Sequence, residues 1–177
     1  MNRKIIYPVS LISISVIVFL CWWYCFSITT IIFVRHADRD GDNDALTQAG
    51  TDRASELLHV AEKAGITAIY HSGANRTRLT VTPLSNALGV AMTEIADPQM
   101  TIDDIFSNHR GQTVIVAGHS NTVPQMIELA GGPAMPNISH NEYDNLFVLT
   151  HGYRWFVSTK LLNLQYGEES PMVMGAE

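Results

Sequence analysis

The sequence TTIIFVRHADRD, residues 29–40, joins an apolar strand pattern to two basic side chains. Residues 29–34 are rich in β-branched side chains and do not alternate with polar ones, which is typical of a parallel strand buried on both faces. The run ends abruptly at Arg35 and His36. Because ligands of open α/β sheets bind outside the carboxyl ends of the strands, the stretch predicts a functional site at the tip of a buried parallel strand.

The rest of the chain alternates between helix and strand patterns. Thr47 is the predicted N-cap of one helix, and Gly89 ends another, which Pro83 kinks or breaks. Two late strands are predicted to turn at His151 and Gly152. The predicted strands are residues 66–70, 90–95, 114–117, 146–150 and 153–159, the last extended by 161–166, and the predicted helices are residues 47–64, 74–88, 102–108 and 122–129. This order predicts a three-layer αβα sandwich with a mostly parallel central sheet.

Residues 5–26 form an uncharged, mostly apolar run of 22 residues. A helix of that length crosses the roughly 30 Å hydrocarbon core of a bilayer. With Arg3 and Lys4 before the run and aromatic residues near its end, residues 1–4 are predicted to be cytoplasmic and residues 5–26 to be an uncleaved membrane anchor. Residues 27–177 would then form one periplasmic or extracytoplasmic domain. A cleaved signal peptide and a buried core helix are the alternatives.

Charge and cysteine content exclude several functions. Of the 11 Lys and Arg residues, nine follow Ser27, together with all 17 Asp and Glu residues, so this part has a formal charge of −8. An acidic domain is a poor partner for nucleic acid, which is bound through basic patches. Cys21 and Cys25, the two cysteines, lie in the apolar run, so the remaining chain offers no thiol nucleophile and no thiolate metal site.

Three of the predicted strands end in polar tips. These tips are Arg35-His36, His71-Ser72-Gly73 and Gly118-His119-Ser120. If these strands are parallel neighbours, one crevice receives Arg35, His36, His119 and the Arg76/Arg78 pair. Arg binds phosphoryl oxygens bidentately and His can accept a phosphoryl group on a ring nitrogen, so the set suits phosphoryl transfer. A metal site, the rival use of His, does not normally place Arg beside the ligands, and the acidic residues 38–44 lack the spacing of a calcium loop.

Four motifs resemble those of the histidine phosphatase superfamily, also called phosphoglycerate mutase-like. They are VRHAD at 34–38, SGANRTRLTVTPL at 72–84, VAGHSNTVPQMIELAGG at 116–132 and NEYDNLFVLT at 141–150. Their order and spacing resemble a small, membrane-anchored bacterial member of branch 1. The resemblance covers residue 29 to about residue 167, almost all of the chain beyond the apolar run.

Carried over to this sequence, the resemblance implies that His36 is the nucleophile that becomes phosphohistidine. Arg35, Arg76 and His119 would hold the phosphoryl oxygens, with Arg76 preferred to Arg78 because it stands where the family's helix begins. Flanking cations should lower the pKa of His36, and a hydrogen bond from its other ring nitrogen to a backbone carbonyl should fix its tautomer. His119 is expected to act as a donor. Neither a metal nor a cofactor is implied.

A general acid for the leaving group is unassigned. The family often supplies a carboxylate between the second Arg and the second His, where this chain has Glu94, Asp97, Asp103 and Asp104. Asp97 and Glu94 are the better-placed candidates. Asp38 is predicted to border the site and to orient the nucleophilic loop. The other histidines are expected to be structural or at the surface, although His71 lies near the predicted crevice; they are His59, His71, His109, His140 and His151.

Three functions remain open at this point. The first is a membrane-anchored phosphomonoester hydrolase acting on a small phosphorylated substrate, for which the resemblance suggests an envelope sugar phosphate. The second is a phosphoglycerate mutase, disfavoured because 42 residues separate Arg76 from His119, which leaves little room for substrate-covering insertions. The third is a non-catalytic phosphate-binding module. No oligomeric state is predicted.

Overall fold

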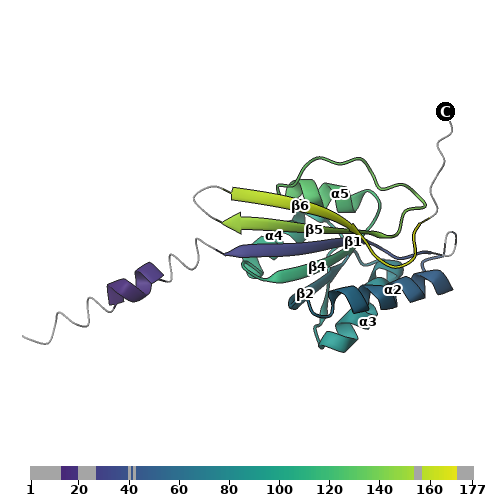
Figure 1. Ribbon diagram of the computed structural model, residues 1–177, viewed down its shortest axis with the longest axis horizontal. Helices are drawn as coiled ribbons and strands as arrows, with labels where there is room; N and C mark the ends of the chain where they lie inside the picture. Colours follow the sequence, from purple (N-terminus) through teal and green to yellow (C-terminus); the bar gives the residue numbers. More distant parts are fainter. Residues whose placement is uncertain (1–12, 20–26, 40, 42, 154–156, 171–177) are drawn as a thin grey trace, which may run out of the picture.

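The computed structural model describes residues 13–19, 27–39, 41, 43–153 and 157–170. The domain is built on a six-stranded sheet in the order β3-β2-β4-β1-β5-β6 (Figure 1). The strands are β1 (Ile28–Arg35), β2 (Ile66–His71), β3 (Met92–Glu94), β4 (Thr113–Gly118), β5 (Asn145–Tyr153) and β6 (Val157–Gln165), and the helices are α2 (Gln48–Ala61), α3 (Asn75–Leu88), α4 (Pro98–Asn108) and α5 (Thr122–Leu129).

The sheet is mixed rather than mostly parallel. Strands β3, β2, β4 and β1 run parallel to one another, as predicted. Strands β5 and β6 are antiparallel to their neighbours, because a hairpin returns the chain along the edge beside β1. The four parallel strands include β1, β2 and β4, whose carboxyl ends carry the predicted site residues.

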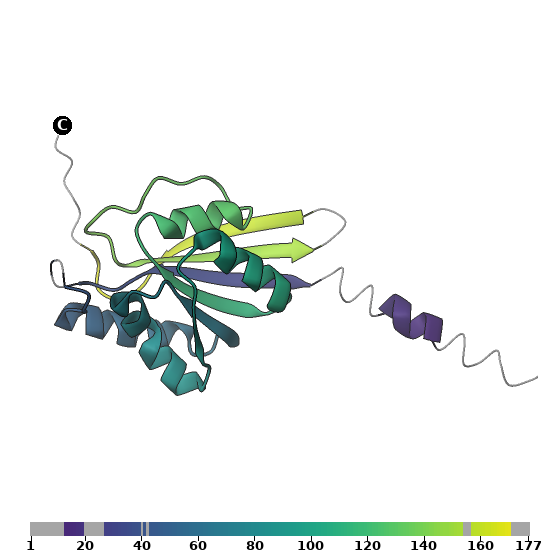
Figure 2. The same cartoon turned by 180° about the vertical axis from the view of Figure 1, so that it is seen from behind.

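Strand β1 is buried on both faces, which confirms the prediction from its unalternating sequence. Ile31 and Phe33 belong to the core that also contains residues of α4 and α5, whereas Ile32 and Val34 belong to the core shared with α2 and α3. None of the four is more than 6% exposed. Figure 2 shows α4 and α5 from behind, on the face of the sheet away from α2. The three layers are therefore helix, sheet and helix, as expected.

The helix ends follow the predicted signals with small shifts. The Thr47 side chain accepts a hydrogen bond from Gly50 N at 3.0 Å, which confirms it as the N-cap of α2, although α2 ends at Ala61, before the predicted residue 64. Gly89, with φ of 65°, ends α3 in the left-handed region that glycine tolerates. Helix α4 starts at Pro98, four residues earlier than predicted, because the Asp97 carboxylate caps it.

The predicted turn at His151 and Gly152 is wrong. Both residues lie inside β5, where His151 pairs with Thr159 and Gly152 with Ser158 of β6. The buried His151 ring also packs 4.5 Å from the Phe106 ring, which ties this residue to the core. A Gly following a His resembles a turn signal, but ladder pairing on both sides of β5 decides the conformation here. The antiparallel hairpin itself is confirmed.

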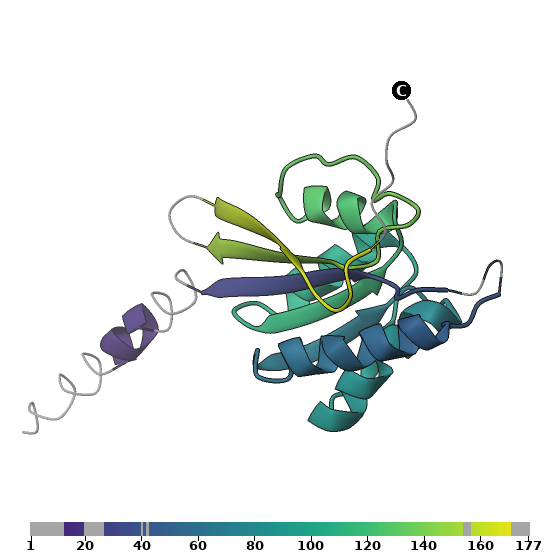
Figure 3. The same cartoon turned by 45° about the vertical axis from the view of Figure 1, so that its right-hand side comes forward.

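The predicted anchor at residues 5–26 falls mostly outside the described residues. Its described part, residues 13–19, is helical and exposed. Within the described residues, no helix has both the length and the apolar content needed to cross a bilayer. The chain enters β1 at the end of the sheet that lies opposite the carboxyl end of β1, where the candidate site is located (Figure 3).

Candidate active site

The carboxyl ends of β1, β4 and β2 bring the two predicted histidines together. Arg35 of β1 is in register with Gly118 of β4, and the His36 backbone N–H donates to the Gly118 carbonyl at 2.9 Å. The His36 and His119 rings consequently lie with their centroids 5.5 Å apart in an edge-to-face arrangement. Residues that are 83 positions apart in sequence thus share one site because two parallel strands end side by side.

His36 is buried and held in a single tautomer. Its Nδ1 lies 2.9 Å from the Ala37 carbonyl oxygen, which can only accept, so Nδ1 carries the proton and Nε2 carries the lone pair. Burial, and after it the charges of Arg35, Arg76 and His119, lowers the pKa of His36 to about 3. The structure contains the expected tautomer-fixing bond. Burial, rather than the flanking cations, is the main cause of the lowered pKa.

His119 is positioned by Ser72 and Arg76. Its Nε2 lies 2.8 Å from Ser72 Oγ, and its Nδ1 lies 3.3 Å from Arg76 Nη2. A guanidinium can only donate, so Nδ1 accepts and the ring proton on Nε2 is given to Ser72. Burial, followed by the charge of Arg76, lowers the pKa of His119. The donor role predicted for His119 would therefore require a second proton or a change of tautomer.

Arg76 begins α3 beside His119, whereas Arg78 lies apart. The Arg76 guanidinium bonds Asp44 Oδ1 through Nη1 at 2.8 Å and reaches His119 through Nη2. Its Nε is buried and has no hydrogen-bond partner among the described residues. Arg78 is exposed and donates to Asn75 Oδ1 at 2.6 Å. The geometry therefore places Arg76, and not Arg78, among the residues of the site.

Arg35 lies in the site but is partly committed to a distant loop. It is 2% exposed, and its Nη1 donates to three backbone carbonyls, those of Ser139 at 2.8 Å, His140 at 3.0 Å and Glu142 at 2.8 Å. Its guanidinium carbon lies 4.1 Å from the centre of the Tyr143 ring. The Nε is buried and has no hydrogen-bond partner among the described residues. The sequence predicts Arg35 at the tip of β1, but it does not predict the hydrogen bonds of Arg35 to residues 139–142.

The four candidate acids are not equivalent. Asp97 Oδ1 accepts from Met100 N at 2.8 Å as the cap of α4, and Asp103 and Asp104 bond side chains of α4 or Tyr70. Glu94 ends β3 in register with His71, and its Oε1 would lie 2.8 Å from a Cβ added to Gly73. The carboxylate of Glu94 is therefore beside the loop that carries Ser72. The geometry favours Glu94 over Asp97 as the acid, and the assignment stays a prediction.

Several residues near the site escaped the sequence reasoning. Thr80 Oγ1 accepts from Ala37 N at 2.8 Å, and Ser72 Oγ lies 3.2 Å from Thr77 Oγ1, so the start of α3 braces both histidine loops. Burial is the main cause that lowers the pKa of Arg35 and His119, and the positive charge of Arg39 adds to the lowering. Ser72 and Thr77 stand inside the motif at 72–84, which could have flagged them. No sequence signal links Thr80 to Ala37, because the contact arises from the packing of α3 against β1.

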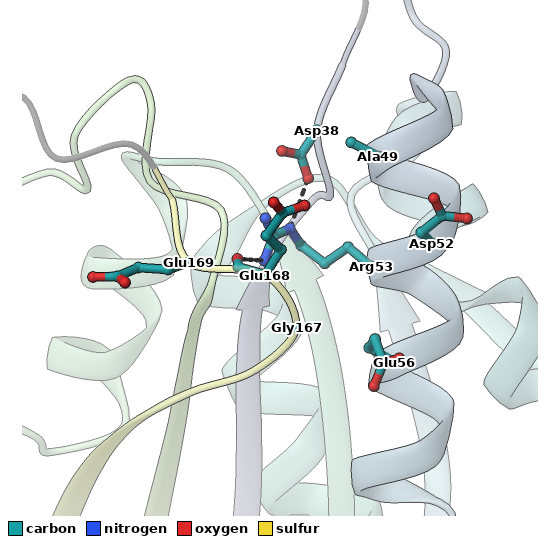
Figure 4. Close-up of a pocket in the computed structure, with 8 residues that line it drawn as sticks. All are labelled: Asp38, Ala49, Asp52, Arg53, Glu56, Gly167, Glu168 and Glu169. Carbon is teal, nitrogen blue, oxygen red and sulfur yellow. Dashed lines mark hydrogen bonds and ion pairs between the residues drawn. The ribbon is translucent and has the colours of Figure 1, made fainter.

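Asp38 turns away from the histidines toward Arg53. Its Oδ2 lies 2.7 Å from Arg53 Nε in a largely buried ion pair, and Arg53 Nη1 also donates to the carbonyls of Tyr166 and Glu168. Figure 4 shows this pair in a pocket of about 710 Å³ whose other charged residues are Asp52, Glu56, Glu168 and Glu169. The acidic lining is unsuited to a phosphate dianion. Asp38 therefore fixes the loop that follows His36 to α2 from outside the site.

The described residues contain no group of three or more His, Cys, Asp or Glu side chains arranged to hold a metal ion. The two site histidines instead face Ser72, Ala37 and Arg76, which are partners suited to orienting neutral rings. The arrangement can present the unprotonated Nε2 of His36 to an electrophile, with Arg35 and Arg76 close to that nitrogen.

Comparison with known proteins shows the fold. No protein-family model matches the sequence. No curated protein matches it either. Among solved structures, SixA from Agrobacterium tumefaciens, a candidate phosphohistidine phosphatase, is 22% identical with a TM-score of 0.55, over 78% of this chain and 99% of that one.

Two further structures have other substrates in their names. The mycobacterial glucosyl-3-phosphoglycerate phosphatase is 11% identical, with a TM-score of 0.60 over 75% of this chain and 96% of that one. The phosphoglycerate mutase of Plasmodium falciparum is 15% identical, with a TM-score of 0.53 over 85% of this chain and 98% of that one. The predicted α/β architecture is confirmed, and the chain shares its fold with these three solved structures.

Proposed function

We propose that this chain is a phosphomonoester hydrolase that works through a phosphohistidine at His36. The observation that carries the proposal is a buried imidazole with its proton fixed on Nδ1, which leaves a lone pair on Nε2 beside Arg35, Arg76 and His119. A lowered pKa keeps this nitrogen unprotonated at neutral pH, as a nucleophile requires. The cations around it match the charge that a transferring phosphoryl group spreads over its oxygens.

The reaction has two steps. Nε2 of His36 attacks phosphorus and forms an N–P bond, while the P–O bond to the alcohol breaks and the alcohol takes up a proton. Water then attacks phosphorus and returns a proton to the group that protonated the alcohol, the N–P bond breaks, and inorganic phosphate leaves with the imidazole neutral again. Arg76, Arg35 and, once it carries a second proton, His119 stabilise the equatorial oxygens in both steps. Glu94 is the best-placed donor of the alcohol proton, because its carboxylate lies at the Gly73 loop.

The substrate is a small phosphorylated molecule in this proposal. The solved relatives are named for a phosphohistidine, for glucosyl-3-phosphoglycerate and for phosphoglycerate, so the fold itself does not select among them. An envelope sugar phosphate suits an extracytoplasmic domain. The acidic surface charge means that selection rests on the few cations of the site rather than on the overall field.

The location belongs to the same proposal. Residues 5–26 anchor the chain in a membrane, residues 1–4 are cytoplasmic, and residues 27–177 lie on the periplasmic or outer side. The entry of the chain into β1 at the edge opposite the site supports this arrangement (Figure 3), because a membrane at that end leaves the site accessible. A reporter that is active only in the periplasm, fused after residue 177, tests the topology.

A non-catalytic phosphate-binding module is the second candidate. The lack of an established proton donor favours it, because Asp97, Asp103 and Asp104 already accept hydrogen bonds from neighbouring groups and Glu94 is exposed. A phosphoglycerate mutase is a weaker alternative, since α3, the short β3 and α4 fill the interval between Arg76 and His119.

The test uses the full chain purified in detergent micelles. With EDTA present, it should hydrolyse p-nitrophenyl phosphate, and His36→Ala should lose this activity while His59→Ala, at an exposed position, retains it. Brief incubation with a 32P-labelled substrate should trap an acid-labile, alkali-stable adduct that is absent from His36→Ala. Full activity without His36 would contradict the mechanism, and phosphate binding without turnover would favour the binding module.

A further inference from the structure

The loop that follows His36 projects a carboxylate onto the start of α3. Its base is held by an antiparallel bridge between Arg39 and Leu46 and by a 3.0 Å hydrogen bond from Thr47 N to the Asp38 carbonyl. Asp44 lies near the end of this loop and reaches Asn75 and Arg76, more than 30 positions further along the chain. The contact joins the loop after β1 to the loop after β2, on the two sides of the site.

Asp44 completes a helix end that cannot cap itself. Residue 74, at the N-cap position of α3, is Ala, whose side chain offers no acceptor. Asp44 supplies it instead: Oδ2 accepts from Asn75 N at 2.7 Å and Oδ1 from Arg76 N at 3.1 Å. The Asn75 side chain in turn donates to the Asp44 carbonyl at 2.7 Å. These three bonds join the loop to the first two residues of α3.

The same carboxylate holds the guanidinium of Arg76. Asp44 Oδ1 lies 2.8 Å from Nη1, while Nη2 of the same group lies 3.3 Å from His119 Nδ1. The planar fork is thereby fixed at one end, and its Nη2 and Nε are left on the side of the second histidine. A long, flexible side chain so held loses less freedom when it binds an anion than one that swings in solvent.

We propose that Asp44 is a positioning residue of the active site, which holds Arg76 in the orientation needed to bind phosphoryl oxygens. The inference rests on the proposed function for the identity of the ligand, a phosphate dianion. It is distinct from the role of a proton donor, because Asp44 accepts hydrogen bonds at both of its oxygens. The N–H groups of Asn75 and Arg76 lower the pKa of Asp44, in agreement with a carboxylate that stays ionised.

Two other roles for Asp44 predict different effects of its removal on phosphate binding. If its carboxylate competes with phosphate for the helix end and for Arg76, removing its charge tightens phosphate binding. If it merely caps α3, removing it lowers the melting temperature and leaves phosphate binding unchanged. A positioning role predicts weaker phosphate binding, even though a negative charge has been removed from the vicinity of an anion.

The experiment measures inorganic phosphate binding to the full chain in detergent micelles by calorimetry, together with p-nitrophenyl phosphate kinetics. Asp44→Asn keeps an oxygen acceptor for the cap but loses the ion pair, and it should weaken phosphate binding and kcat/KM by about tenfold or more. Asp44→Ala should weaken both further. Asp52→Asn is the matched control, since it removes one exposed carboxylate that bonds Gln48 of its own helix, and it should change neither constant.

A double variant separates positioning from a general electrostatic effect. In an Arg76→Gln background, Asp44→Asn should cause little further loss of phosphate affinity, because the group that it positions has been removed. Tighter phosphate binding in Asp44→Asn, or unchanged affinity with a lower melting temperature, would overturn the inference. Phosphate binding without any hydrolysis would contradict the proposed hydrolase and still test Asp44, whereas a wild-type chain that binds no phosphate would overturn both.

Discussion

Acid should destabilise this protein through His36, and the structure sets the size of the effect. The folded protein lowers the pKa of His36 from the ordinary 6.5 to about 3, mainly through burial of the ring. As the pH falls through 6.5, the unfolded chain takes up a proton that the folded protein refuses until the pH is near 3. Folding stability is therefore lost between these values, by about 1.4 kcal/mol for each pH unit.

The measurement compares urea unfolding of the full chain and of His36→Gln, in detergent micelles, at pH 7 and pH 5. Glutamine cannot titrate in this range, and its amide can still donate to the Ala37 carbonyl. Between the two pH values the wild type should lose about 2 kcal/mol more than the variant. His71 and His119, whose pKa values burial also lowers, titrate in both proteins and largely cancel.

Equal losses in the two proteins would refute the reasoning, since they would mean that His36 binds its proton as readily when folded as when unfolded. Activity gives a second reading of the same group. If His36 is the nucleophile, as proposed, the acid side of the kcat/KM profile should carry no step near pH 6.5 from it, because its Nε2 is already unprotonated there.

Four further predictions concern stability and the proton donor. Arg35→Ala should cost about 3 kcal/mol or more and speed amide exchange in residues 139–142, whereas faster exchange confined to the α2 helix would argue against the contact. Gly50→Ala should cost about 3 kcal/mol by thermal unfolding, because its new Cβ collides with the Asp38 carbonyl; a stability equal to that of the wild type would mean that the loop moves freely. Asp97→Ala should lose about 1 kcal/mol of stability through the α4 cap with kcat unchanged. Glu94→Gln should lower kcat more for an alkyl phosphate than for p-nitrophenyl phosphate, and equal effects on both would exclude it as the proton donor.

The parts of the site that sequence could predict are those that strand geometry dictates. Residues 29–34 lack polar alternation, so a strand buried on both faces was the expected outcome, and its tip had to lie at the carboxyl edge. Parallel pairing with β4 then places His119 beside His36 without further information. The cap at Thr47 and the stop at Gly89 are likewise local effects that one or two residues determine.

The parts that sequence could not predict depend on contacts between distant loops. The reach of Asp44 to Arg76, and of Arg35 to residues 139–142, requires knowledge of how three loops pack, and no periodicity encodes it. The hairpin turn was misplaced for a related reason. Gly152 looks like a turn residue by itself, but pairing with both β1 and β6 keeps it in the strand.

The grip of Arg35 on residues 139–142 also bears on the order in which the protein matures. Its three hydrogen bonds span 104, 105 and 107 positions. The Arg35 guanidinium can therefore form them only after residues 139–142 have been synthesised and ordered. Contacts of such long range form late, since the intervening chain must be ordered first. A chain still emerging from the ribosome would carry Arg35 without these three bonds. In the proposed mechanism, His36 therefore gains its complete surroundings only near the end of folding.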